Sequence, residues 1–255
     1  MSTPRVAPLS QRVWAQSRFE LRTTLSNAEQ LFLSFAMPLG ALVVLAMTDV
    51  VTVFGYQEGQ RDIIAASAGL GLSIAASAFT GQAIATGFDR RYGVLRQLAT
   101  TPLGTTGLIL AKIVSVYIIT AVQVVVTFIV IALLPVNFAL TASLPQILGI
   151  FLSRFLGTAA LTALALAFAG TARAEAVLAG SNILWVVGAG VGGLVVKHPG
   201  LWGTIASLTP FGALGDSLRT ALVSGGVDWS AQFVLLVWAV LGIIAGATWF
   251  SFESK

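Results

Sequence analysis

The sequence contains no cysteine, a single histidine and very few charged residues. Of its 255 residues only 9% are Asp, Glu, Lys or Arg, whereas 56% are hydrophobic. Soluble domains carry about 25% charged residues because their surface faces water, so this composition excludes an ordinary soluble protein and a disordered chain. Without cysteine there is no disulfide scaffold, and with His198 as the single histidine no Cys/His metal cluster can be assembled.

The formal net charge of +4 does not indicate nucleic acid, because the basic residues are not gathered on one solvated module. A positive excess also arises in membrane proteins, which retain Lys and Arg on their cytoplasmic side. The mean hydropathy of +0.91 fits such a protein. We therefore predict an all-α, polytopic membrane helical bundle without a nucleic-acid partner.

Six apolar stretches are long enough to cross a bilayer, which takes about 20 residues per helix. The stretches are continuous rather than alternating, which favours helices over the strands of a β-barrel. Residues 1–255 are predicted to form a single transmembrane permease domain. Its elbow helix is expected at about 9–30, and its spans at about 31–51, 63–86, 108–134, 148–172, 177–196 and 231–251.

The distribution of basic residues predicts the orientation of the bundle. Ten lie on the side that holds both chain ends and the connection after span two, against four on the other side. The positive-inside rule therefore places both termini in the cytoplasm, with the protein in the cell (plasma or inner) membrane. Arg154, one of the four, is expected near the outer interface, where it either snorkels to headgroups or contacts substrate or an outer gate.

The segment before span one is amphipathic. At 100° per residue its apolar side chains share one arc, which contains Val13, Trp14, Leu21, Leu25 and Ala28. Arg18 and Arg22 lie beside that arc, so a helix along the inner membrane surface is expected. It is either a plain basic anchor or an elbow that moves with the bundle. Pro38 follows inside span one, where its missing N–H is expected to kink the helix.

The connection after span two combines several charges with a helical apolar pattern. Pro102, Gly104 and Gly107 are expected to end its short helix. Because apolar residues need not recur in a solvated loop, this segment is either a docking helix for a cytoplasmic partner or a helix packed on its own chain. Its candidate docking residues are Asp89, Arg90, Arg91, Tyr92, Gly93, Val94, Leu95 and Leu98.

This connection resembles the coupling helix of the membrane permeases of type-2 ATP-binding-cassette (ABC) exporters. In that family an elbow helix leads into span one, and the coupling helix between spans two and three begins acidic-basic-x-x-Gly and precedes Thr-Pro-Leu. Asp89 to Leu95 and Thr101 to Leu103 match this pattern, with Lys112 near the start of span three. The family often has a second acid where Arg91 stands and Thr where Val94 stands.

A second match lies between spans five and six. Family members have short re-entrant helices there, with a Pro roughly ten residues before an Arg, and Pro210 and Arg219 fit this spacing. The resemblance implies two permease subunits, as two copies or as a copy and a paralogue, together with two ABC ATPase subunits. It best fits the antibiotic and multidrug branch, with a hydrophobic or amphipathic drug-like or lipid-like substrate exported from the membrane.

An energy source is missing from the chain itself, since it contains no Gly-x-x-x-x-Gly-Lys-Ser/Thr phosphate loop. ATP and Mg²⁺ are therefore expected on the partner ATPase, with no cofactor, metal or catalytic residue on this chain. Proton coupling would need a deep ionisable group, and Asp49 is expected at the outer interface. A lipid-modifying enzyme or a structural membrane protein remains an alternative, although Asp89 has few acids and no histidine near it.

Span two carries small residues at every fourth position, among them Ser73 and Ser77. Small residues at this spacing allow close helix packing, and the hydroxyl groups can bond across the contact. Alternatively, Ser73 and Ser77 line a weakly polar lateral path for an amphipathic substrate.

Overall fold

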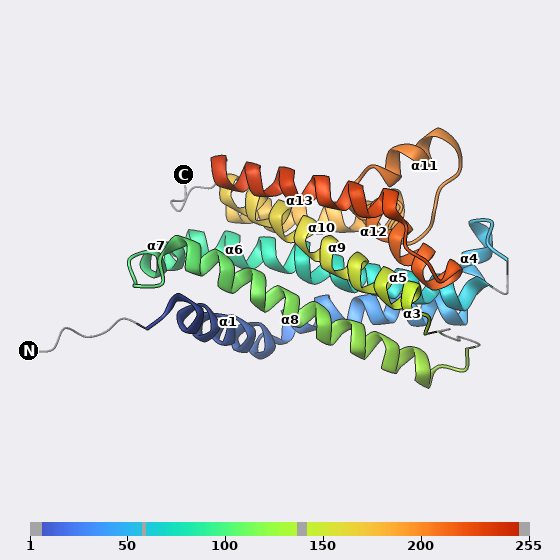
Figure 1. The fold of residues 1–255 in the computed structure, drawn as a ribbon, viewed down its shortest axis with the longest axis horizontal. Helices are drawn as coiled ribbons and strands as arrows, with labels where there is room; N and C mark the ends of the chain where they lie inside the picture. Colours follow the sequence, from blue (N-terminus) through green and yellow to red (C-terminus); the bar gives the residue numbers. More distant parts are fainter. Residues whose placement is uncertain (1–6, 58–59, 137–141, 250–255) are drawn as a thin grey trace, which may run out of the picture.

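The structure is a computed structural model, and it describes residues 7–57, 60–136 and 142–249. In these residues all regular structure is helical. Figure 1 shows one elongated bundle, with α7 at one end and α4 and α11 at the other; these are called the α7 end and the α11 end below. The two chain ends, for which a cytoplasmic location is predicted, lie outside the described residues.

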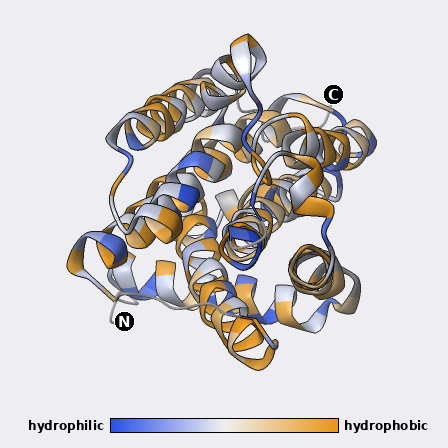
Figure 2. Cartoon of the chain, turned by 90° about the vertical axis from the view of Figure 1, so that its right-hand side faces the viewer, coloured by the Kyte–Doolittle hydropathy of each residue, from blue (hydrophilic) through white to orange (hydrophobic). Residues whose placement is uncertain are grey.

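Four helices of the described residues are long and apolar enough to cross a membrane: 61–91, 106–133, 144–171 and 229–249. Two shorter apolar helices, 34–47 and 174–190, coincide with predicted spans one and five. Figure 2, seen from the α11 end, shows hydrophobic colouring on the peripheral helices as well as inside. A bundle with an apolar periphery is a membrane protein, as its composition predicts, while the number of six crossings stays a prediction.

The N-terminal fifth of the chain comprises a helix that lies along the bundle and a first apolar helix with one irregular stretch. The elements are α1 (Leu9–Ser26), α2 (Ala28–Leu31), the π-helical turns η1 (Phe32–Ala36), α3 (Met37–Met47) and α4 (Val50–Val53). Pro38 follows η1 and cannot bond to the Ser34 carbonyl one turn earlier. The side chain of Gln123 donates to that carbonyl instead, at 2.7 Å. The irregularity predicted at Pro38 thus takes the form of wider turns just before it.

The central helix of the bundle consists of α5 (Arg61–Ala75), the π-helical turns η3 (Ala76–Gly81) and α6 (Gln82–Arg91). Its most apolar stretch is 94% buried inside the chain, because α3, α8, α9, α10 and α12 pack around it. The small residues of this helix make the close packing possible. Leu42 of α3, for example, lies directly against Gly69 and would collide with any larger side chain there.

The remaining elements follow the predicted order with two differences in length. They are α7 (Val94–Ala99), α8 (Gly104–Leu133), α9 (Leu144–Thr171), α10 (Ala174–Gly190), α11 (Gly200–Ser207), α12 (Pro210–Arg219), η4 (Thr220–Ser224) and α13 (Trp229–Trp249). Gly104 and Gly107 do not end the short helix as predicted, because α8 already begins at Gly104. The helix α10 ends at Gly190, before the predicted 196, and the chain folds back there.

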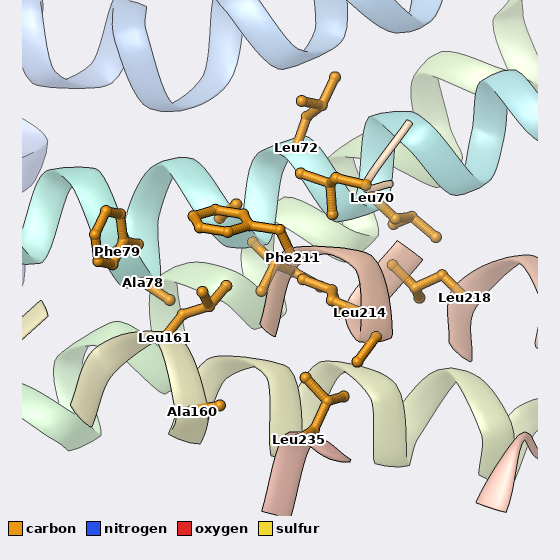
Figure 3. Close-up of a cluster of buried hydrophobic side chains, with 14 of the residues drawn as sticks. Leu70, Leu72, Ala78, Phe79, Ala160, Leu161, Phe211, Leu214, Leu218 and Leu235 are labelled. Atoms are coloured by element: carbon orange, nitrogen blue, oxygen red, sulfur yellow. The ribbon is translucent and has the colours of Figure 1, made fainter. Parts of the chain in front are cut away.

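The helix α12 enters the interior of the bundle, as expected for a re-entrant helix. Every residue from Pro210 to Arg219 is buried, and the helix packs against α5, α9 and α13. Figure 3 shows Phe211, Leu214 and Leu218 directed into the core between the central helix and α9. The ring of Phe211 meets Phe79 edge to face, with centroids 5.6 Å apart. This contact joins α12 to the central helix.

Candidate coupling site at the α7 end

Lys112 is the node of a buried ion-pair cluster at the α7 end. Its side chain is only 2% exposed, and its ammonium lies 2.7 Å from a carboxylate oxygen of Asp89 and 3.2 Å from one of Glu20. Gln16 also donates to Glu20, at 3.1 Å. A buried ammonium is tolerated only when such partners replace its lost hydration. The cluster therefore connects α1, α6 and α8 through side chains alone.

Glu20 completes the cluster, although the sequence pattern predicts no role for it. Lys112 and Asp89 are candidates from the family resemblance and the count of basic residues. One signal was available, since Glu20 is the only acid in the segment 9–26, among three arginines. An acid that close to the predicted membrane surface needs a cationic partner, and Lys112 supplies it.

Arg90 and Arg91 bond to the connection between α9 and α10. The guanidinium of Arg90 is buried and donates to the carbonyl oxygen of Ala172, at 2.8 Å. Arg91 forms an ion pair with Glu175, in the first turn of α10. With Asp89, these residues form the last turn of the central helix rather than part of a separate docking helix. Arg90 is consequently covered by its own chain.

The exposed turn that follows has an inward and an outward side. Gly93 adopts a left-handed conformation, with φ of +73°, and turns the chain from α6 into α7. Leu95 is fully buried, which agrees with packing on the chain itself and not with the expectation that it meets a partner. Val94 and Leu98 are half-buried. Tyr92 is 70% exposed and stacks on Phe88.

Three outward side chains, Tyr92, Arg96 and Gln97, are thus available on this turn, and Thr100, Thr101 and Pro102 continue the exposed surface. We call Tyr92, Arg96 and Gln97 the outer side of the α7 turn. An aromatic residue and an arginine beside polar groups are the composition typical of protein–protein contacts.

The elbow segment forms α1, which lies along α8 in Figure 1. The side that meets α8 is centred on Ser17, whose hydroxyl is buried and lies 3.1 Å from the carbonyl oxygen of Ala111. Trp14 and Leu25, predicted on the apolar face, lie at the edge of the side that meets α8, and both are about half exposed. Arg18 lies over the Trp14 ring, at 5.6 Å. Arg22, like Arg18, is exposed.

Ser73 and Ser77 are both buried within the chain. Ser77 accepts a hydrogen bond of 2.7 Å from Gln123 of α8, which is the same amide group that bonds to Ser34. This arrangement matches the interpretation of close helix packing. A substrate path along the two hydroxyl groups would require the surrounding helices to separate.

At the α11 end, Pro210 and Arg219 begin and end α12. Pro210 is the first residue of the helix, after the cap Thr209. Arg219 donates to the carbonyl oxygens of Leu194 and Gly193, at 3.0 and 2.7 Å, and pairs with Asp216 at 2.9 Å. Through Arg219, α12 is therefore bonded to the turn that follows α10.

Among curated proteins no match to this chain is found. A family model described as ABC-2 family transporter protein matches residues 22–252, which extend from the elbow helix through α13. The match concerns the family as a whole and does not single out the antibiotic and multidrug branch. Members of this family are the membrane components of transporters that work with ABC ATPase subunits. Because the match covers nearly the whole chain, the protein belongs to the ABC-2 transporter family and is a permease subunit of an ABC transporter.

Proposed function

We propose that this permease is the membrane path of an exporter and that ABC ATPase subunits dock on the outer side of the α7 turn. The observation that carries this proposal is the position of the turn. It directly continues the buried central helix, and its exposed side chains Tyr92, Arg96 and Gln97 face away from the bundle. A force applied there reaches the interior through the last turn of α6.

The Lys112 cluster is proposed to pass this motion to the elbow. Asp89 moves with α6 because it lies in its last turn, and Lys112 joins it to Glu20 of α1. When an ATPase pair binds ATP and Mg²⁺ and closes, the α7 turn and α1 are expected to shift together. Such a shift would exploit packed interfaces that have discrete arrangements.

The proposed cargo is a hydrophobic or amphipathic molecule, such as a drug, an antibiotic or a lipid-like compound. Between its charged ends, over residues 63–88, the central helix offers small side chains and hydroxyl groups rather than charges, which does not suit a sugar or a metal ion. We propose that the cargo crosses between this chain and a second copy or a paralogue, in the cell membrane and among its lipids. The proposed role is multidrug efflux, and both termini are proposed to lie in the cytoplasm.

A test of docking purifies the permease from its native membranes and measures how much ABC ATPase subunit is retained. Tyr92→Glu combined with Gln97→Glu is expected to reduce co-purified ATPase by roughly tenfold or more, because aromatic anchors contribute most of an interface's affinity. Val53→Glu serves as the control, since Val53 is as exposed but lies in α4 at the α11 end. Equal co-purification of both variants and the wild type would contradict docking on the α7 turn.

The orientation is tested separately with single cysteines, which is straightforward because the chain has none. A cysteine at Gly226 is expected to react with an impermeant maleimide added outside intact cells, and one at Gln97 only after permeabilisation. The reverse pattern would place the α7 end outside and make docking of a cytoplasmic ATPase impossible there.

A further inference from the structure

Arg154 occupies an unusual position for a cation, within the long apolar helix α9. It lies ten residues after Leu144, where α9 begins, and seventeen before Thr171, where it ends. These intervals correspond to about 15 and 25 Å of helix. The expectation that Arg154 lies near the outer interface stays a prediction, since about 25 Å of helix separate it from Thr171.

The guanidinium of Arg154 is held against α8. It donates to the backbone carbonyl oxygen of Tyr117, and it lies over the Tyr117 ring at 5.9 Å from the centroid. The Tyr117 hydroxyl in turn donates to the carbonyl oxygen of Phe155, at 2.9 Å. Both contacts join α8 to α9 and fix the cation beside a ring, an arrangement with favourable electrostatics.

Aromatic side chains around Arg154 open toward the surroundings of the bundle. Phe155 is 44% and Phe151 53% exposed, and their rings stack with centroids 6.0 Å apart. Tyr117 packs against Phe155 at 5.1 Å. The side formed by α8 and α9 is thus an apolar, aromatic surface with one fixed positive charge, which is the composition of a site for an amphiphile.

The charge of Arg154 differs from those of Lys112 and Arg219 in having no acidic partner. Lys112 and Arg219 each bond to a carboxylate, whereas in the described residues no carboxylate lies within 4 Å of Arg154. Its Nε is also buried without a hydrogen-bond partner among them. A charge on an apolar helix whose groups are partly buried is costly and is normally compensated by a charge of opposite sign. An anionic group from outside the chain would provide that compensation.

We infer that Arg154, Tyr117 and Phe155 form a binding site for the acidic head of an amphiphile whose apolar chain lies along α8 and α9. The head is a carboxylate or a phosphate, which accepts charge-assisted hydrogen bonds from the guanidinium. The binding itself stands independently of transport. As an assignment of substrate class, namely anionic amphiphiles, the inference rests on the proposed function.

Binding is tested by native mass spectrometry of the purified full chain in a neutral detergent, with oleate as the probe. Oleate is expected to bind the wild type roughly tenfold more tightly than Arg154→Gln, because a hydrogen bond to a charged group contributes about 1.5–3 kcal/mol. Arg154→Lys keeps the charge and is expected to bind with an intermediate affinity. Arg173→Gln is the matched control, since Arg173 is an exposed cation outside α9, and it should bind like the wild type.

A measurement on the wild type alone keeps the inference testable if Arg154→Gln fails to fold. Methyl oleate has the same chain without the charge, so it is expected to bind roughly tenfold more weakly than oleate, for the same loss of a charge-assisted bond. Equal affinity for oleate and its methyl ester, or equal oleate affinity of the wild type and a folded Arg154→Gln, would overturn the inference.

Two further arms separate a resident lipid from a cargo. If the anion is a resident lipid, phosphatidylglycerol carried through purification is lost from Arg154→Gln and oleate is not exported. If it is a cargo, vesicles containing the permease and its ATPase export oleate in an ATP-dependent way, and Arg154→Gln slows this export. Either result supports the site when the binding difference is present. ATP-dependent export without any difference in oleate binding between the wild type and Arg154→Gln would contradict the proposed site but leave the proposed function intact.

Discussion

Lys112 at the α7 end and Arg219 at the α11 end are buried cations that are held in different ways. At the α7 end, Lys112 bonds only to side chains, the carboxylates of Glu20 and Asp89 on two other helices. Each of these partners can adjust its rotamer as the helices move. The link therefore tolerates displacement while it keeps the three helices connected.

At the α11 end, Arg219 bonds mainly to the backbone. Its fork meets the carbonyl oxygens of Gly193 and Leu194, and its carboxylate partner Asp216 lies one turn away on the same helix. Backbone groups cannot rotate away, and Gly193 is fixed at a φ of +84° that other residues avoid. The comparison indicates an adjustable α7 end and a rigid α11 end, as expected under the proposal that the permease is driven from the α7 turn.

Breaking the Lys112 cluster is expected to have the largest effect on stability. Lys112→Met leaves two carboxylates without their buried cation, so the free energy of unfolding should fall by about 3–5 kcal/mol. Denaturant unfolding in detergent micelles measures this loss. The triple variant Lys112→Met, Glu20→Gln, Asp89→Asn removes all three charges and should recover much of the stability. If the triple variant is no more stable than Lys112→Met alone, the cluster is not held by charge pairing.

The hydrogen bonds of Arg219 at the α11 end are expected to contribute less to stability than the Lys112 cluster, but to depend more on geometry. Arg219→Lys retains the charge next to Asp216 but cannot form the fork to two carbonyl groups. The expected loss in the free energy of unfolding is about 1.5–3 kcal/mol, the magnitude of a hydrogen bond to a charged group. Lys197→Ala provides the control, because Lys197 is exposed and 3.9 Å from the same carboxylate, and should change stability little. A similar loss of stability in both variants would argue against a contribution from the hydrogen bonds of Arg219 to the backbone.

The smallest effect is expected at Asp228, which caps α13 near the α11 end. Burial raises the pKa of its carboxyl group, but hydrogen bonds from Ser230, the Ala231 amide and Thr220 outweigh this, so the pKa is lowered from 3.8. Because the pKa is lower in the folded state, Asp228 stabilises the protein above its ordinary pKa. That contribution disappears as the pH falls through the folded-state value.

Thermal unfolding between pH 7 and pH 3 measures this contribution. Asp228→Ala should lose about 0.5–2 kcal/mol at neutral pH, the usual effect of removing a helix cap. Asp228→Asn keeps a capping side chain and should lose less stability, while its difference from the wild type shrinks toward acidic pH. A difference that grows as the pH falls would contradict the direction of the pKa shift.

Most of the helical arrangement was predictable from the sequence, because bilayer-length apolar runs have few alternatives. The re-entrant helix α12 and the helix preceding span one lie where the pattern indicated. The lengths of α6 and α10 were not predictable. Charged residues such as Arg90 were expected to end a span, but partners on the α9–α10 connection allow α6 to continue. The fold-back after Gly190 depends on the distant Arg219.

The candidate site was predictable in its location and only partly in its roles. The pattern around Leu95 indicated an apolar face but left open whether a partner or the chain itself covers it, because both bury the same side chains. The structure assigns Leu95 to the interior. The partnership of Lys112 with Glu20 spans 92 residues of sequence and has no local signal. The depth of Arg154 in the membrane stays a prediction, because the start of α9 carries no charge to mark it.

The shielding of the central helix bears on how the protein is made. Its apolar stretch has a mean hydropathy of 1.7, compared with 2.6 for the stretch in α8, since neighbours rather than lipid surround it. A segment of this kind partitions less readily into the bilayer by itself. We therefore expect it to remain near the insertion machinery during synthesis until α8 and α9 emerge and enclose it. Truncations that end before α9 should be degraded faster than the full chain.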